Sequence, residues 1–486
     1  MVGRKHNLRV SKLSGTWWSR VICTLLLVFS VAQTSNAQLL SLGSSQAQTR
    51  LVVRDTLGLN NLLNLCKLLH CTVDHGLGDP DGELFLVKLP ALLAPVTTKL
   101  MLSLNLGVIS VELDQVVQTQ ATTAGPPPDY LTDQTPVNYY GTTVWRGYIT
   151  QPANQLIRTD ATHAKFNTAG SGVVVAVIDT GVDPNHPVLK NVLLSGYDFT
   201  RNQPGGSEMS DVSQSTVAVL DNSQPAQVSQ STVAVLDQST VAVLDGPRYE
   251  AFGHGTMVSG IIHLVAPQAR IMPLKSFEAN GTGYNSDILS AIYYAVGHGA
   301  NVINMSFNYS SYSPELANAI TYATNHGVIC VAAAGNNGEQ ATVYPAALKN
   351  VIDVASTGDN DIRSTFTNYG APPVWLAAPG EGVMTTYPFG TYAAGWGTSF
   401  STPLVTGTAA MLVSTYNVQA GTQVGVSVGS LSLSLSLGAN ANGPSSEKQA
   451  ATALSHAQPI SDPQLGYGRL DTYQAVQAWR RSLGLN

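Results

Sequence analysis

Charged side chains are scarce in this chain, at 11% of its 486 residues. Its 24 Lys and Arg residues and 30 Asp and Glu residues give a formal net charge of -6. The first 37 residues hold five of the basic residues and no acidic ones, which leaves 19 basic against 30 acidic residues and a formal charge of -11 for the remainder. Acidic surfaces repel phosphate backbones, so this balance argues against nucleic acid as a partner.

Cysteine is also rare, with four residues in the whole chain. Cys23 lies in an apolar run near the N-terminus, and Cys330 stands alone in a strand-like segment, where a small inert thiol is expected. Cys66 and Cys71 lie in a helical-looking segment, and their spacing suits a disulfide only if the helix ends between them. These residues support neither a disulfide framework nor a thiol nucleophile.

The sequence has no apolar run long enough to span a membrane, which takes about 20 residues. The run Val21 to Ala32 has 12 residues, follows a basic start and precedes the small-residue cleavage signal Ser35-Asn36-Ala37. We therefore expect residues 1–37 to be a signal peptide, with no stable membrane span after its cleavage and a secreted product, extracellular or periplasmic. An uncleaved membrane anchor is the alternative.

Strand and helix patterns alternate in two separate stretches. Residues 38–120 alternate as in a small ferredoxin-like α+β domain. Gly125-Pro126-Pro127-Pro128 then forms a stiff linker. Downstream, repeated βα units predict a parallel sheet covered on both faces by helices, a three-layer α/β/α fold. Strands are expected near residues 173, 271, 302, 328, 351 and 375, and helices over 287–297 (with Ser286 as N-cap), 314–326, 398–416 and 472–483.

Three polar residues stand where this pattern places ends of strands and starts of helices. Asp179 ends the apolar run Val173 to Ile178, His254 lies between two glycines before another apolar run, and Ser399 lies among small residues where a helix begins. A serine hydroxyl is a weak nucleophile unless a base removes its proton and a third group holds that base. The order Asp, His, Ser is one of the orders known for this triad.

Each residue also has an ordinary structural interpretation. A strand-end aspartate is more often a turn former or helix cap, and a histidine beside glycine is more often structural. The three together, in the expected contexts, favour catalysis. Asn336 adds a fourth group, since it follows a buried strand and its amide can donate to an oxyanion.

These motifs resemble those of the subtilisin-like serine proteases, the subtilases, over about residues 172–410. The matching motifs are Asp179-Thr180-Gly181-Val182-Asp183, His254-Gly255-Thr256, Ala333-Ala334-Gly335-Asn336, Phe366 to Gly370, Ala378-Pro379-Gly380 and Gly397-Thr398-Ser399. The resemblance implies that Asp179 orients the His254 imidazole and that His254 is general base and then general acid. It also implies that Ser399 is the nucleophile and that Asn336 shares the oxyanion with the Ser399 N–H.

The resemblance also implies a zymogen. Residues 38–120 look like a subtilase propeptide, which is both inhibitor and folding helper; an ordinary accessory domain is the alternative. Residues 121–150 are then the linker and the start of the mature enzyme, residues 151–486 form the peptidase domain, and autoprocessing occurs near the proline linker. We expect a monomer whose partners are polypeptide substrates and its own propeptide.

Substrate recognition is expected from segments on which an extended peptide adds as a β-strand. By resemblance these are Gly281, Thr282, Gly283, Ser306, Phe307, Asn308, Ala333, Ala334 and Gly335. Asn308 and Tyr309 stand where the family usually has two glycines, so the pocket should be narrower. No cofactor is required for the chemistry and no metal ligand is assigned. The family's strongest calcium site is expected to be absent, because Val188 follows His186-Pro187, while structural calcium elsewhere is left open.

Two low-complexity insertions interrupt the peptidase domain, at 200–248 and 421–457. In the first, the octad Gln-Ser-Thr-Val-Ala-Val-Leu-Asp occurs at 214–221, 230–237 and 238–245. The second contains a Ser-Leu alternation at 430–437, typical of an edge strand or of disorder. Expansion in tolerant surface loops is favoured over a binding role. A repeat-bearing surface binding protein and a pseudoprotease on the same fold remain the alternative functions.

We expect a serine-directed sulfonyl fluoride to label Ser399, because only a serine activated by a neighbouring base attacks such a reagent. Peptide mapping by mass spectrometry locates the label, with the Ser399→Ala variant as control. A natively folded wild-type protein that stays unlabelled would contradict the catalytic assignment.

Overall fold

The structure, a computed structural model, describes residues 49–90, 95–118, 125–212, 233–235, 247–370, 374–422 and 446–485. All of these lie in one of the two units of the chain, Thr49–Asn486. The other unit, Met1–Gln48, lies outside the described residues, and so does the expected signal peptide. No helix in the described part is long and apolar enough to cross a membrane.

The apolar runs of the sequence form neighbouring strands of an eight-stranded sheet with the order β10-β9-β12-β8-β14-β15-β16-β17. The strands from β9 to β17 in this order pair in parallel, and only β10 is antiparallel to its neighbour. Parallel strands bring their carboxyl ends to one edge, where ligands bind in such sheets. The strands are β8 (Val174–Asp179), β9 (Tyr197–Asp198), β10 (Gln203–Pro204), β12 (Arg270–Lys275), β14 (Val302–Met305), β15 (Ile329–Ala333), β16 (Val351–Thr357) and β17 (Leu376–Pro379).

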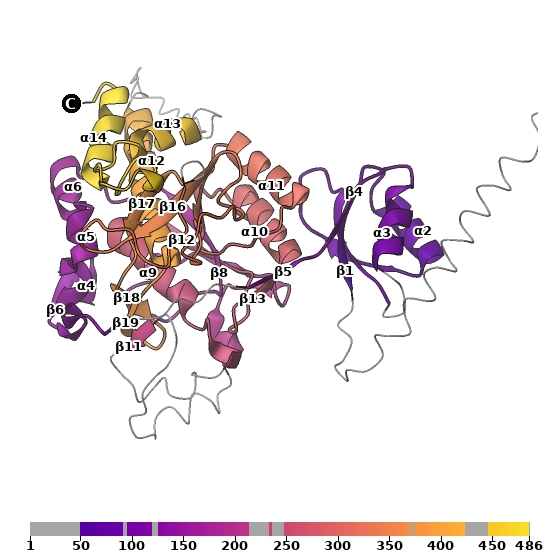
Figure 1. The fold of residues 1–486 in the computed structure, drawn as a ribbon, viewed down its shortest axis with the longest axis horizontal. Helices are drawn as coiled ribbons and strands as arrows, with labels where there is room; N and C mark the ends of the chain where they lie inside the picture. Colours follow the sequence, from indigo (N-terminus) through magenta and orange to yellow (C-terminus); the bar gives the residue numbers. More distant parts are fainter. Residues whose placement is uncertain are drawn as a thin grey trace, which may run out of the picture. The chain divides into compact units, whose positions relative to one another are not determined.

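Helices cover both faces of this sheet, as the alternation of side chains along β8 requires. Val175 and Val177 join the core beneath α9 (His254–Val265) and α12 (Thr398–Thr422). Ala176 and Ile178 point to the other face and join the core beneath α10 (Asn285–Gly297) and α11 (Pro314–Asn325). The domain built on this sheet therefore has the predicted three-layer α/β/α architecture (Figure 1).

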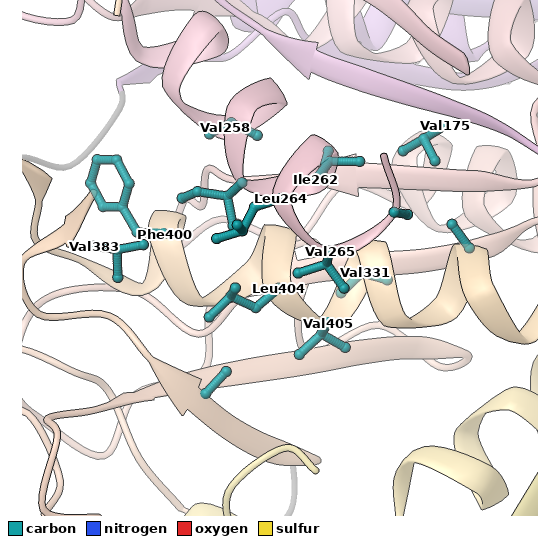
Figure 2. Packing of buried hydrophobic residues seen from close by; sticks show 14 of the residues in the cluster. Val175, Val258, Ile262, Leu264, Val265, Val331, Val383, Phe400, Leu404 and Val405 are labelled. Carbon is teal, nitrogen blue, oxygen red and sulfur yellow. The ribbon is translucent and has the colours of Figure 1, made fainter. Parts of the chain in front are cut away.

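The packing of α9 against α12 is especially close. Figure 2 shows Val265 of α9 beside Leu404 and Val405 of α12. A Cβ added to Gly407 would lie 2.6 Å from the Val265 Cβ, so glycine is what allows this approach. The close contact fixes the two helices that begin with His254 and with the segment around Ser399.

A four-stranded antiparallel sheet with the order β2-β3-β1-β4 precedes the peptidase domain. Its helices α2 and α3 pack on one face, where Leu51, Leu62 and Phe85 belong to a separate small core. Its other face contributes Val52 and Leu86 to the core beneath α10 and α11. The elements are β1 (Arg50–Asp55), α2 (Leu59–Leu69), β2 (Thr72–Gly76), β3 (Leu84–Lys88), α3 (Pro95–Ser103) and β4 (Val108–Leu113).

Smaller elements complete the described chain. Short sheets pair β5 with β13, β6 with β7, and β19 with both β11 and β18. The remaining elements are β5 (Val116–Gln118), β6 (Pro136–Tyr139), β7 (Thr142–Trp145), β11 (Val233–Val235), β13 (Thr282–Tyr284), β18 (Val383–Tyr387), β19 (Thr391–Gly395), α4 (Arg146–Thr150), α5 (Pro152–Leu156), α6 (Thr159–Phe166), α13 (Ser446–Leu454) and α14 (Thr472–Ser482), with single 3₁₀ turns at Asp129–Thr132, Glu208–Asp211, Pro247–Tyr249 and Pro463–Leu465.

Two local expectations have clear outcomes. Ser286 as N-cap of α10 is wrong, because the helix begins at Asn285 with Tyr284 as its N-cap. The Ser286 N–H and hydroxyl instead donate to the Asp114 carboxylate, which comes from the N-terminal domain. The condition for a disulfide is met, since α2 ends at Leu69, between Cys66 in its last turn and Cys71 beyond it, and the two cysteines are bonded.

The described residues include only parts of the two expected insertions. In the first, β11 comes from the second exact octad and pairs with β19, with Val233 opposite Gly395. The other octads lie outside the described residues, as does the Ser-Leu alternation. In the second, α13 buries Ala450, Ala453 and Leu454 in the main core. The end of that expected insertion is therefore helical and packed.

Asp353 of β16 offers a test of the core. The residue is buried, its Oδ1 has no hydrogen-bond partner in the described residues, and burial raises the pKa of its carboxyl to about 7. Because the pKa is higher in the folded than in the unfolded protein, ionisation of this carboxyl favours unfolding. Asp353 therefore costs no stability below its unfolded pKa near 4, and the cost grows as the pH rises to 7.

We therefore expect Asp353→Asn to match the parent protein at pH 4 and to be more stable at pH 8, by at most roughly 4 kcal/mol. Urea unfolding at both pH values, in a Ser399→Ala background that prevents self-digestion, measures this. An equal loss of stability with pH in both proteins would show that Asp353 is not the group responsible.

Candidate active site

Asp179 and His254 meet at the carboxyl edge of the sheet. Asp179 is the last residue of β8 and His254 is the first of α9. The His254 Nδ1 lies 2.7 Å from the Asp179 Oδ1, which also accepts the Thr180 N–H at 2.8 Å. The carboxylate is buried and the imidazole is 14% exposed. The aspartate therefore holds one ring nitrogen, which leaves the other ring nitrogen for acid-base chemistry.

Ser399 is the second residue of α12, and a proline shapes its surroundings. Pro403 lies four residues further along the helix and has no N–H to donate to the Ser399 carbonyl. The Ser306 hydroxyl donates to that carbonyl instead, at 3.1 Å. In return the Ser399 hydroxyl donates to the Ser306 carbonyl, at 3.0 Å. The end of β14 and the start of α12 are thus joined by a reciprocal pair of bonds.

The imidazole lies beside the start of α12. The His254 ring centroid is 5.8 Å from that of Phe400, the residue after Ser399. The Ser399 hydroxyl points to the Ser306 carbonyl in this structure and makes no hydrogen bond to His254. A hydroxyl turns freely about its Cβ–Oγ bond, and catalytic hydrogen bonds often form only when substrate arrives. The structure therefore brings Asp179 and His254 into contact and places Ser399 next to them.

Asn336 is fixed by the same helix. Its Oδ1 accepts hydrogen bonds from the Thr398 N–H at 2.9 Å and from the Thr398 hydroxyl at 2.8 Å. These bonds settle which end of the amide is the oxygen, so the Nδ2 group is presented as a donor. The backbone N–H of Ser399, at the N-terminus of α12, is a second donor aided by the helix dipole. Together they form a site suited to a developing negative charge.

The residue directly before Asn336 needs to be glycine. Ala333 ends β15, and the Ala334 N–H bonds the Val354 carbonyl of the next strand. Gly335 has φ of +99°, and an added Cβ would lie 2.5 Å from the Asn368 Nδ2. Both constraints hold the backbone that positions the Asn336 side chain.

The expected peptide-binding strand is present and already paired. Gly281 precedes β13, whose residues Thr282 and Gly283 lie opposite Gln118 and Val117 of β5 in an antiparallel ladder. The Gln118 side chain adds bonds to the Asn280 carbonyl, at 2.6 Å, and to the Thr282 hydroxyl, at 2.9 Å. The chain's own segment therefore lies where the sequence analysis expects an extended peptide.

The residues after β14, from Ser306 to Tyr309, make contacts of different kinds. Ser306 contacts Ser399, as described above. The Phe307 side chain is 1% exposed and packs on Phe277 in the core, so only its backbone faces the site. Asn308 is buried, and the Tyr309 hydroxyl donates to the Asn285 side chain at 2.8 Å. The two residues that replace the family's glycines are thus held within the fold.

Two observations bear on the expectation about calcium. The Val188 side chain is apolar and buried in the core, so it carries no oxygen that could ligate the ion. Among the residues that the structure describes, no group of three or more His, Cys, Asp or Glu side chains is placed to hold a metal ion.

Glu208 is a buried acid that the sequence analysis does not single out. It lies in the 3₁₀ turn Glu208–Asp211 and contacts the segments on both sides of the Asp179–His254 pair. The sequence around it, Gly205-Gly206-Ser207-Glu208-Met209-Ser210-Asp211, carries no motif that marks this acid.

Comparisons with known proteins match the part of the chain that contains these groups. A family model described as the subtilase family, peptidase S8, matches residues 170–430. Thermitase of Thermoactinomyces vulgaris is 35% identical over 249 residues, which cover 50% of this chain and 76% of thermitase. Subtilisin DY of Bacillus licheniformis is 33% identical over 277 residues, which cover 55% of this chain and 86% of subtilisin DY.

Solved structures show the same fold. Fervidolysin from Fervidobacterium pennivorans, a keratinolytic enzyme related to subtilisin, superposes with a TM-score of 0.63 at 23% identity. The superposition covers 89% of this chain and 61% of fervidolysin. A likeness at this identity concerns the arrangement of the backbone.

The reciprocal bonds of Ser306 and Ser399 yield a thermodynamic prediction. Ser306→Ala leaves the buried Ser399 carbonyl without its donor, which should cost about 1–3 kcal/mol of unfolding free energy. Pro403→Ala supplies a helical N–H for that carbonyl, so the loss caused by Ser306→Ala should be smaller when Ala stands at 403. Urea unfolding of the four proteins, all carrying His254→Ala to prevent self-digestion, gives the coupling energy. Identical losses with proline and alanine would contradict this account of the Ser399 carbonyl.

Proposed function

The chain belongs to the subtilase family and is a subtilisin-like serine protease, and on this basis we propose that Asp179, His254 and Ser399 are its catalytic triad. We also propose that the protein is exported and is made as a zymogen that processes itself. The observation that carries the triad is the 2.7 Å bond between Asp179 Oδ1 and His254 Nδ1, with Ser399 at the adjoining helix start.

The proton moves through His254. When substrate enters, the Ser399 hydroxyl turns from the Ser306 carbonyl to the free ring nitrogen of His254, which takes its proton as the oxygen attacks the peptide carbonyl carbon. Asp179 stabilises the resulting imidazolium through the Nδ1 bond. His254 then gives the proton to the leaving amine, and water hydrolyses the acyl group on Ser399 by the same steps.

The oxyanion is stabilised by groups fixed before the reaction. The Asn336 Nδ2 and the Ser399 N–H donate to the carbonyl oxygen as it becomes negative, and neither needs to reorient, because the amide oxygen of Asn336 is held by Thr398. The chemistry needs no cofactor. Polypeptides are the substrates, and they are expected to pair with β13 as extended strands.

The N-terminal domain fits the role of a propeptide with a ferredoxin-like fold. Its β1-α2-β2-β3-α3-β4 order and antiparallel sheet support that assignment. Its carboxylates meet the starts of two helices of the peptidase domain. Asp114 accepts the Ser286 N–H of α10 at 2.8 Å, and Glu112 accepts the Glu315 N–H of α11 at 2.8 Å. Negative charge at helix N-termini is favourable, so the domain stabilises both helices.

The segment after this domain supports inhibition and self-cleavage. β5 pairs with β13, so residues 116–118 exclude a substrate strand from the same edge. After residues that lie outside the described part, the chain continues at Gly125, which packs against the Trp396 ring. Trp396 lies three residues before Ser399. We propose that the enzyme cuts its own chain near the proline linker Gly125-Pro126-Pro127-Pro128.

Intact-mass analysis tests self-processing. Wild-type protein collected from the medium or periplasm should lack residues 38 to about 128, whereas Ser399→Ala should begin at Gln38 and keep them. Ser401→Ala is a matched control, because its hydroxyl bonds the β17 backbone and it should process normally. Equal masses for wild type and Ser399→Ala would refute self-processing, and a start at Met1 would refute the signal peptide.

A further inference from the structure

A single buried carboxylate connects the segments that carry Asp179 and His254. Glu208 has no exposed surface. Its Oε2 accepts the Gly253 N–H at 2.9 Å and the Thr180 hydroxyl at 3.2 Å, and its Oε1 contacts the Thr256 hydroxyl. Thr180 directly follows Asp179, and Gly253 directly precedes His254. The carboxylate therefore binds the residue immediately next to each member of the proposed catalytic pair, through the Thr180 hydroxyl and the Gly253 backbone N–H.

A second set of bonds closes the connection. The Thr180 hydroxyl accepts the Gly255 N–H at 3.0 Å, so Thr180 links Glu208 to the residue on the other side of His254. The Thr256 hydroxyl accepts the Asp183 N–H at 2.8 Å, which ties the first turn of α9 to the segment after β8. His254 is thus flanked by two backbone N–H groups, at Gly253 and Gly255, that lead to Glu208 directly or through one hydroxyl.

The three segments approach one another too closely for side chains to absorb a displacement. An added Cβ at Gly181 would lie 2.7 Å from the Glu208 backbone nitrogen. An added Cβ at Gly255 would lie 2.0 Å from the Gly181 carbonyl oxygen. Contacts between backbones transmit small shifts directly, so the turn that carries Glu208 fixes where β8 ends and where α9 begins.

Several other ionisable groups surround the buried carboxyl of Glu208. The ionisable groups that surround it are Asp179 and Asp183 from the segment at the end of β8, Asp211 from its own turn, Lys275 from β12 and His254 from α9. The Lys275 ammonium donates to Asp211 and to the Thr180 and Phe277 carbonyls. Burial raises the pKa of Glu208 to about 8, so the neutral form is accessible at neutral pH.

We propose that Glu208 is a positioning residue of the protease, which sets the distance and orientation between Asp179 and His254 by holding Thr180 and Gly253. This proposal rests on the catalytic roles proposed above. Glu208 does not touch the reacting atoms. Its effect on catalysis passes through Thr180, which follows Asp179, and Gly253, which precedes His254. A displacement of about 1 Å at such a site costs about 10²-fold in rate.

Three substitutions of Glu208 distinguish an effect on the position of the catalytic pair from an effect on folding stability. Glu208→Gln keeps size and hydrogen bonding, because the amide oxygen can accept from Gly253 and Thr180 while its NH₂ donates to the Thr256 hydroxyl. It should stay within about 3-fold of wild-type kcat, since it preserves the acceptor geometry. Glu208→Asp is shorter by one methylene and cannot hold both segments, and Glu208→Ala leaves both donors unpaired. These two should lower kcat by about 10²-fold with little change in KM.

Asp353→Ala is the matched control, since it also removes a buried carboxyl but lies in β16 away from the pair. Activity on a chromogenic peptide anilide is normalised to folded protein by near-ultraviolet circular dichroism. The pH profile of kcat should shift its acid limb in Glu208→Asp and Glu208→Ala and stay unchanged in Glu208→Gln and Asp353→Ala. The low-field proton resonance of His254 Nδ1–H should move only in the first two.

Wild-type kcat and pH profile in folded Glu208→Asp would overturn the proposal, as would equal kcat losses in Glu208→Ala and Asp353→Ala. If Glu208→Ala does not fold, the comparison of Glu208→Asp with Glu208→Gln decides the question. An inactive wild type would refute the proposed protease activity instead. The His254 resonance would then still report whether Glu208 positions the ring.

Discussion

The parallel pairing of β8 with β12 and β14 is the constraint on which the site depends. It places the ends of β8, β14 and β15 side by side, so that Asp179, Ser306 and Asn336 come to one edge although they are far apart in the sequence. The two helices that supply His254 and Ser399 then need only to begin at that edge. Their close packing across Gly407 and Val265 keeps both starts in place. The catalytic geometry is therefore a consequence of strand order and helix contact.

Much of this arrangement is readable from local patterns. The apolar run before Asp179, the glycines around His254 and the small residues around Ser399 predict the strands and helix starts that the structure contains. What local patterns miss are partners from distant segments. Ser286 resembles an N-cap, but it lies inside α10, and its N–H and hydroxyl donate to Asp114 from the N-terminal domain. Phe307 adjoins the site in sequence, but its side chain belongs to the core. Glu208 has no motif of its own, because its three partners come from distant segments, Thr180 just after β8 and Gly253 and Thr256 at the start of α9.

The N-terminal domain and the peptidase domain share one of the two main cores. Val52 and Leu86 of the small sheet pack in the same cluster as Ile288 and Leu316 from α10 and α11. Arg54 adds an ion pair to Glu315 at 2.8 Å across this boundary. Removing the domain would expose apolar side chains together with the starts of both helices. An interface of this kind suits the propeptide role proposed for this domain.

The origin of β11 in a repeated octad affects how the fold accommodates a gain or loss of residues. It is drawn from an octad, and side chains along a strand alternate with a period of two, so a repeat of eight residues returns the same side chains to the same face. Gain or loss of a whole octad leaves an equivalent Val-Ala-Val segment to pair with β19. A change of chain length by whole octads therefore keeps the same side chains on the same face of the strand at this edge of the fold.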